Sequence, residues 1–157
     1  DRYNSIQKCW KNLNKKKVKN LMIEMLDLYA ENLIYNYENQ TNKGRLDNPT
    51  ILMHEENISC GDQITVYIRI EDNKVKDIKY EGIGCIISMG SANIVCDYVK
   101  DKDLNDIINL NLEDLFKIIG FTPTPSRLHC ATLGLRAIKH AILNYLSKDS
   151  EKYLNGL

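Results

Sequence analysis

The sequence lacks the features of a membrane, secreted or modular protein. No stretch approaches the roughly 20 consecutive apolar residues of a membrane span, and no hydrophobic core of a signal peptide is present. We find no internal repeat and no domain linker in the 157 residues. Hydrophobic residues make up 43% and charged residues 27% of the chain, which is typical of one compact globular domain.

Net charge is also absent, because 21 basic residues balance 21 acidic ones. Residues 1–20 nevertheless carry seven lysines and arginines against Asp1 alone. We therefore expect a basic arm over 1–20, a domain over 21–150 and a short tail over 151–157. No base-reading motif accompanies the lysines, so we interpret the arm as a solvated helix start or the remnant of a targeting segment, with neither nucleic acid nor membrane as partner.

The cysteines form no C-x-x-C pair, and their number is odd. Without a secretion signal, an odd number argues against a disulfide framework and for a reducing compartment. Reduced cysteines then point to core packing, metal binding or sulfur chemistry. The five are Cys9, Cys60, Cys85, Cys96 and Cys130.

Hydrophobic periodicity predicts an α+β fold. Residues 63–70 and 75–80 alternate with period two around a turn at Asp72 and Asn73, which indicates a β-hairpin. Helical spacing marks 18–35 and the segment from about Cys130 onward, for which we expect about four turns. We predict a small antiparallel sheet of about three strands with helices packed on one face.

Shorter elements complete this prediction. Residues 36–48 are expected to form a loop, and Ser88 is a plausible N-cap for a helix that reaches Val99. Residues 103–119 suggest two short helices that end at Gly120. The proline-containing segment 122–126 is expected to be an extended linker.

Three of the cysteines lie where an element begins or turns. In an extended segment, residues two apart point the same way, so Cys60 and Asp62 face one space, and Gly61 between them allows close approach of a ligand. A hairpin returns the end of its second strand, and hence Cys85, to the vicinity of Cys60. Cys130 lies at or near the start of the last helix.

This placement favours thiolate chemistry. Helix N-termini lower the pKa of cysteine, and thiolates bind metals and take part in sulfur transfer. Cys60, Asp62, Cys85 and Cys130 would make a tetrahedral set for zinc or a labile iron–sulfur cluster. On spacing alone, burial in the core is the competing explanation, and we prefer it for Cys96.

Four segments resemble the IscU/SufU family of iron–sulfur cluster assembly proteins. Residues 37–46, Y-E-N-Q-T-N-K-G-R-L, are similar to the family's helix-exit motif. Residues 60–62, C-G-D, match its first ligand motif, and residues 82–92, G-I-G-C-I-I-S-M-G-S-A, match its second. Residues 127–133, R-L-H-C-A-T-L, match its third. The resemblance covers about residues 28–147.

The resemblance implies roles for individual residues. Cys60, Asp62, Cys85 and Cys130 correspond to the ligands, Asp62 to the residue that tunes cluster lability, and Cys130 to the acceptor of persulfide sulfur. His129 and Arg127 match auxiliary positions, and His129 could be an alternative ligand or a proton relay. His54 and His140 match no motif and are expected at the surface.

The resemblance is to the SufU-like branch of the family, with some IscU-like features. N-P-T at 48–50, I-S-M at 87–89 and Arg127 are SufU-like, whereas the gap of 44 residues between Cys85 and Cys130 and the presence of His129 are IscU-like. The L-P-P-V-K chaperone motif of IscU is absent, which argues against an Hsp70-type partner. Asn36 and Gln40 also replace the usual histidine and proline of the first motif.

Three functions follow from these observations. The first is a zinc-dependent sulfur carrier, which as an enzyme would be a sulfurtransferase. It would accept sulfur from a cysteine desulfurase of the SufS/IscS type and pass it to a downstream scaffold or apo-protein. The second is a non-enzymatic scaffold for a transient [2Fe–2S] cluster, with iron or the cluster in place of zinc. The third is a structural zinc module. The expected location is a bacterial cytoplasm, or a plastid or mitochondrion.

Overall fold

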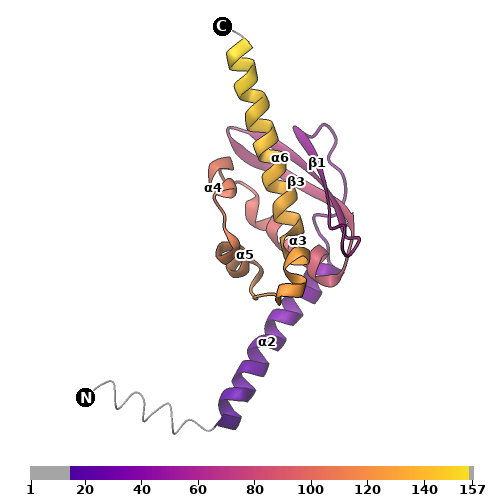
Figure 1. Ribbon diagram of the computed structural model, residues 1–157, viewed down its shortest axis with the longest axis vertical. Coiled ribbons are helices and arrows are strands. Elements are labelled where there is room, and N and C mark those ends of the chain that lie inside the picture. Colours follow the sequence, from indigo (N-terminus) through magenta and orange to yellow (C-terminus); the bar gives the residue numbers. More distant parts are fainter. Residues whose placement is uncertain (1–14, 156–157) are drawn as a thin grey trace, which may run out of the picture. The chain divides into compact units, whose positions relative to one another are not determined.

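The computed structural model describes residues 15–155. Residues 1–14 of the predicted basic arm, Cys9 included, lie outside this range. The chain divides into two compact units, 1–32 and 33–157, and the second contains the sheet and most of the helices (Figure 1). The arm, domain and tail boundaries expected at residues 20 and 150 stay predictions. The elements are α2 (Lys15–Glu38), β1 (Ile51–Glu56), β2 (Gln63–Glu71), β3 (Lys74–Ile83), α3 (Ile86–Val99), α4 (Leu104–Ile108), α5 (Leu112–Ile119), the 3₁₀ turn η1 (Pro125–Arg127) and α6 (Leu128–Asn155).

The sheet has three antiparallel strands in the order β1-β2-β3, so the predicted α+β class is confirmed. The predicted hairpin is present as β2 and β3, and its turn residues Asp72 and Asn73 both adopt positive φ. Ile64, Val66 and Ile68 of β2 point to the helical side and are at most 1% exposed. The alternation that predicted this strand therefore reflects a sheet with one face buried in the core.

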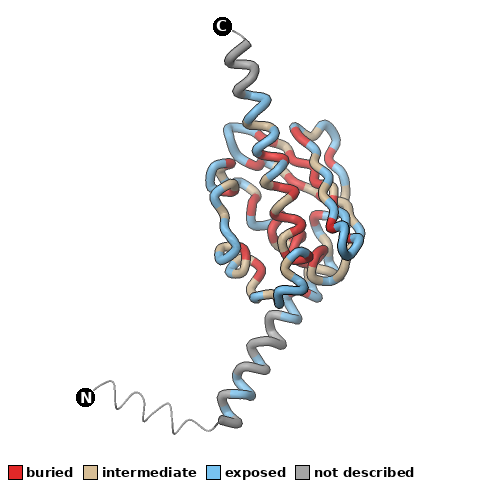
Figure 2. Tube along the Cα trace, in the orientation of Figure 1, coloured by how far each residue is buried: buried red, intermediate tan, exposed pale blue. Residues whose placement is uncertain are grey.

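Helices α3 and α6 cover that face of the sheet (Figure 1). Buried positions are concentrated in α3, the middle of α6 and the central strand (Figure 2). Cys96 is 1% exposed among apolar neighbours, which confirms its predicted place in the core. Across residues 15–155, no helix is both long and apolar enough to cross a membrane.

Three elements differ from expectation. The sequence did not locate β1, because Ile51–Glu56 includes a histidine and two glutamates on an exposed edge. Helix α6 is 28 residues long instead of about four turns, since no proline or glycine interrupts the chain between Tyr145 and Gly156. Pro125 starts a 3₁₀ turn within the expected linker, because its fixed φ suits the first position of a helix.

The packing of α3 against α6 yields a stability prediction. A Cβ atom at Gly134 would lie 3.0 Å from both Cα and Cβ of Ala92. Gly134→Leu should therefore overpack this contact and lower the free energy of unfolding by about 1–3 kcal/mol, despite leucine's better helix propensity. Urea unfolding measures the effect.

Lys148→Leu is the control, because it adds a leucine at an exposed position of the same helix. Its effect should stay within about 0.5 kcal/mol of zero. Equal effects of the two substitutions would show that the contact between Gly134 and Ala92 does not limit side-chain size.

Candidate metal centre

The register of the sheet brings two of the predicted ligand segments to one end. Glu56 at the end of β1 pairs with Gln63 at the start of β2, and Gln63 pairs with Ile83 at the end of β3. The turn after β1 therefore lies beside the exit of β3. Cys60 and Asp62 belong to that turn, and Cys85 follows that exit by two residues.

The turn of residues 57–62 is held by the main chain of Asn57. Its N–H donates to the carbonyl of Asp62 over 2.8 Å, and its carbonyl accepts from the N–H of Gly61 over 2.8 Å and of Cys60 over 3.3 Å. Gly61 has a φ of +75°, a conformation that glycine adopts without strain, and no atom lies within 4 Å of where its Cβ would be. The turn thus presents Cys60 to solvent while it buries Asp62.

Cys85 is the N-cap of α3. Its sulfur accepts the N–H of Ser88 over 3.4 Å, and the Ser88 hydroxyl lies 3.6 Å away. The prediction that Ser88 caps this helix was wrong, because Ser88 is fully buried in the first turn and its hydroxyl donates to the carbonyl of Cys85. The helix start therefore binds the sulfur of Cys85 directly.

Cys130 is the third residue of α6 and is 3% exposed. Ligand atoms of Cys60, Asp62 and Cys130 all lie within 4.8 Å of one another, and Sγ of Cys85 lies 4.0 Å from Oδ2 of Asp62. Zn–S bonds of about 2.3 Å place the sulfurs of a tetrahedral site about 3.8 Å apart. The separations of Cys60, Asp62 and Cys130 suit three ligands of a zinc ion, and Cys85 lies against Asp62, where it could supply the fourth.

The two thiols of Cys85 and Cys130 differ in pKa. Burial works to raise the pKa of Cys85, but hydrogen bonds from Ser88 and the N–H of Ile87 together bring this pKa below the usual value. Burial raises the pKa of Cys130 to about 12, and the charges of Cys85 and Asp62 add to the rise. The expected lowering of the pKa at helix starts therefore holds for Cys85 and is wrong for Cys130, which is buried beside negative charge.

The auxiliary residues lie at the edge of this group. Arg127 and His129 are exposed, and His129 is not among the ligand atoms that gather within 4.8 Å. The main-chain carbonyl of His129 is engaged instead, by the side chain of Asn57 over 2.9 Å. His54 and His140 are exposed as predicted, and each bonds to a glutamate.

Sequence reasoning missed Asn57 and Arg136, which contact the ligand-bearing segments. An asparagine directly after a strand is a turn signal and could have drawn attention to residue 57. No sequence signal reveals that its side chain reaches a carbonyl 72 residues away.

Comparisons with known proteins show the family and the fold of the chain. Residues 28–152 match the model of the NifU-like N-terminal domain. The iron–sulfur cluster assembly scaffold protein IscU of Thermotoga maritima is 29% identical over 131 residues, which cover 73% of this chain and 92% of that protein. The zinc-dependent sulfurtransferase SufU of Bacillus subtilis is 30% identical over 132 residues, which cover 73% and 89%. In fold, the N-terminal part of a NifU-like protein from Brucella abortus matches with a TM-score of 0.64 at 18% identity, over 79% of this chain and 99% of that one.

The opposite pKa shifts of Cys85 and Cys130 predict the order in which the thiols are modified in metal-free protein. Below its pKa a thiol reacts about tenfold faster for each unit of pH, because only the thiolate is nucleophilic. Alkylation of Cys85 should level off at a lower pH than that of Cys130, whose rate should still rise at pH 10. Cys96, which is buried, should react only after unfolding. Site-resolved mass spectrometry follows each thiol.

Cys85→Ser supplies the matched test. Removal of the neighbouring sulfur lowers the pKa of Cys130, because Cys85 contributes to its rise. Cys130 should then be alkylated faster at pH 8 than in the parent chain. An unchanged or slower rate would contradict the coupling between the two sulfurs.

Proposed function

The chain belongs to the family of NifU-like N-terminal domains, which includes the iron–sulfur cluster assembly proteins IscU and SufU, and on this premise we propose that it accepts persulfide sulfur at Cys130. The observation that carries the proposal is the convergence of Cys60, Asp62, Cys85 and Cys130 at one end of the sheet. A cysteine desulfurase is the proposed donor, and a downstream scaffold or apo-protein is the proposed recipient.

The same four residues are the proposed zinc ligands, as three thiolates and one carboxylate. A bound zinc ion would keep the thiolates deprotonated at neutral pH. This matters most for Cys130, because burial and neighbouring charge raise its pKa to about 12 and leave it protonated without a counter-charge. Reduced thiols require a reducing compartment, and the four cysteines of the described chain are all free.

The transfer step conserves electrons. The thiolate of Cys130 attacks the outer sulfur of the desulfurase persulfide, a new S–S bond forms at Cys130, and the S–S bond of the donor breaks. The donor cysteine leaves as a thiolate, and the proton of the persulfide stays on the transferred sulfur. No external oxidant or reductant is consumed.

Apolar side chains beside the ligands suit contact with a protein donor. Ile58 is 96% exposed, Ile83 is 74% exposed and Ile86 is 42% exposed, and each lies within two residues of Cys60 or Cys85. Exposed apolar groups of this kind are typical of interaction sites. They support delivery of sulfur by direct docking of the desulfurase.

Cys130→Ser tests this proposal. Incubation with a cysteine desulfurase and cysteine should leave one extra sulfur, 32 Da, on Cys130 of the parent chain and none at that position in the variant. Intact and peptide mass spectrometry under anaerobic conditions measures the added mass. The physical reason is that serine lacks the nucleophilic sulfur that receives the transferred atom.

Cys96→Ala is the matched control, because Cys96 is buried in the core away from the ligands. It should keep both zinc and sulfur acceptance. Undiminished zinc in Cys60→Ala and Cys130→Ser would contradict the ligand set. Zinc binding without any persulfide at Cys130 would reject the carrier function and leave the metal site intact.

A second candidate is a scaffold for a transient [2Fe–2S] cluster, and Asp62 is the observation that favours it. A carboxylate is a harder and weaker ligand for a soft iron–sulfide unit than a thiolate. Its carboxylate lies within 4.8 Å of the ligand atoms of Cys60 and Cys130, where release of one weak bond would open a cluster to transfer. The cluster is here the cargo of the protein.

The scaffold candidate predicts that Asp62→Cys slows cluster release, because a thiolate holds an iron–sulfide unit more firmly than a carboxylate does. After anaerobic assembly with iron, cysteine and desulfurase, the variant should hold its cluster longer and pass it several-fold more slowly to an apo-ferredoxin. Circular dichroism in the visible range follows the transfer. Asp106→Ala, at an exposed position of α4, should transfer at the parent rate. Equal rates for both variants would argue against Asp62 as the point of release.

A further inference from the structure

We propose that Asn57 and Arg136 form a strut that holds the turn bearing Cys60 and Asp62 against the helix bearing Cys130. Neither residue is a proposed ligand, and both would act by positioning the ligands. The inference rests on the proposed metal site, because the strut matters to function only where that site binds metal.

Asn57 holds the turn together through hydrogen bonds of its main chain. Its main chain bonds to Asp62, Gly61 and Cys60, so a shift of Asn57 moves both ligands of the turn together. The residue is 5% exposed, so water has little access to these main-chain hydrogen bonds.

The side chain of Asn57 joins the turn to α6. Its Nδ2 donates to the carbonyl of His129 over 2.9 Å, and the next residue along the chain is Cys130. One amide group therefore spans from the segment of two ligands to the segment of a third. The bond is charge-neutral and part-buried, so removal of the donor would leave the carbonyl of His129 with one partner fewer.

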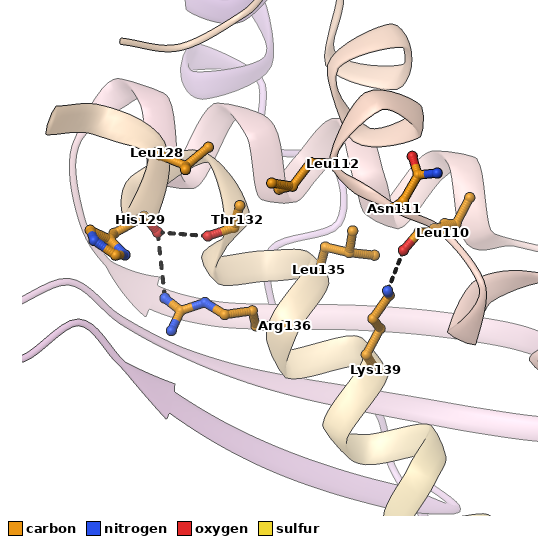
Figure 3. Close-up of a pocket in the computed structure, with 9 residues that line it drawn as sticks. All are labelled: Leu110, Asn111, Leu112, Leu128, His129, Thr132, Leu135, Arg136 and Lys139. Atoms are coloured by element: carbon orange, nitrogen blue, oxygen red, sulfur yellow. Dashed lines mark hydrogen bonds between the residues drawn. The ribbon is translucent and has the colours of Figure 1, made fainter. Parts of the chain in front are cut away.

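Arg136 supports this contact from the next turns of the helix. Its Nη2 donates to Oδ1 of Asn57. The same nitrogen also donates to the carbonyl of His129 over 3.4 Å, as Figure 3 shows. The guanidinium thus fixes the orientation of the Asn57 amide, since the acceptor faces Arg136 and the donor faces His129. Nε of Arg136 is buried and has no hydrogen-bond partner among the described residues, so the bonds of Nη2 to Asn57 and to the carbonyl of His129 orient the side chain.

The geometry has a direct consequence for metal binding. The ligand atoms of Cys60, Asp62 and Cys130 lie within 4.8 Å of one another across two separate segments. Without the strut the turn could move relative to α6. Each binding of metal would then have to bring the ligand atoms of the two segments together again. Partners that orient ligands in this way are worth about 10- to 100-fold in metal affinity.

Zinc competition with a chromophoric chelator tests the strut. Asn57→Ala should weaken zinc affinity about 10-fold or more, and Arg136→Ala should weaken it less, because Arg136 acts through Asn57. The double variant should bind zinc no more weakly than Asn57→Ala. Arg136→Lys should recover part of the loss, since a lysine can still donate to the amide oxygen.

Thr132→Val is the matched control. The hydroxyl of Thr132 also donates to the carbonyl of His129, over 3.3 Å, but it comes from within α6 and makes no link to the turn (Figure 3). Its loss should leave zinc affinity within twofold of the parent. A loss equal to that of Asn57→Ala would show that satisfaction of the carbonyl matters and the link does not.

Hydrogen exchange of the metal-free protein provides a readout that needs no zinc. The amides of Cys60 and Gly61 should exchange faster in Asn57→Ala and at the parent rate in Thr132→Val. Unchanged exchange, or affinity losses of Asn57→Ala and Arg136→Ala that simply add, would overturn the strut. If the parent itself bound no zinc, the proposed function would fail while exchange still tested the strut. Should Asn57→Ala not fold, Arg136→Ala carries the test, because it leaves the turn's residues unchanged.

Discussion

The antiparallel register of the three strands is the constraint on which the candidate metal centre depends. Glu56, Gln63 and Ile83 lie opposite one another, so the turn after β1 and the exit of β3 meet at one end of the sheet. A slip of one residue would turn the buried face of β2 toward solvent, including Ile64 and Val66. The hydrophobic core therefore fixes the register, and the register places Cys85 beside Asp62.

Charge is the second constraint on the site. Asp62 and Cys130 are 7% and 3% exposed, and Cys85 lies beside both. Three thiolates and a carboxylate cannot all be ionised in so small a volume without a compensating cation. The raised pKa of Cys130 is the result, and the entry of a metal must therefore release a proton. Metal affinity consequently falls as the pH is lowered.

The sequence predicted the parts of the fold that rest on local patterns. The hairpin followed from the alternation of residues 63–70, and the place of Cys96 in the core followed from its apolar helical neighbours. Local patterns also suggested Ser88 as the helix cap, since serine is a common cap and cysteine is not. The structure assigns the cap to Cys85, whose sulfur accepts the N–H of Ser88, and places Ser88 inside the first turn of the helix.

Other features have no local pattern. Strand β1 lies at an edge, where only alternate residues meet the core, and its polar residues obscured its periodicity. The contact of Asn57 with His129 joins residues far apart in the chain, so it depends on the packing of α6 against the sheet. The ligand residues could be named from motifs, whereas the contacts that hold them could be found only in three dimensions.

The proposed ligands are held by two separate sets of hydrogen bonds. Cys85 is bound by the N-terminal turn of α3, whereas the turn of Cys60 and Asp62 is tied to α6 by Asn57. Movement of the turn would therefore leave the N–H donors of Cys85 in place, although its contact with Asp62 would change. Cys85 has N–H donors of its own, which stabilise its thiolate when no metal is near. Sulfur carriage and cluster transfer both require a ligand set that opens without unfolding, and separate supports for Cys85 and for the turn supply that property to either function.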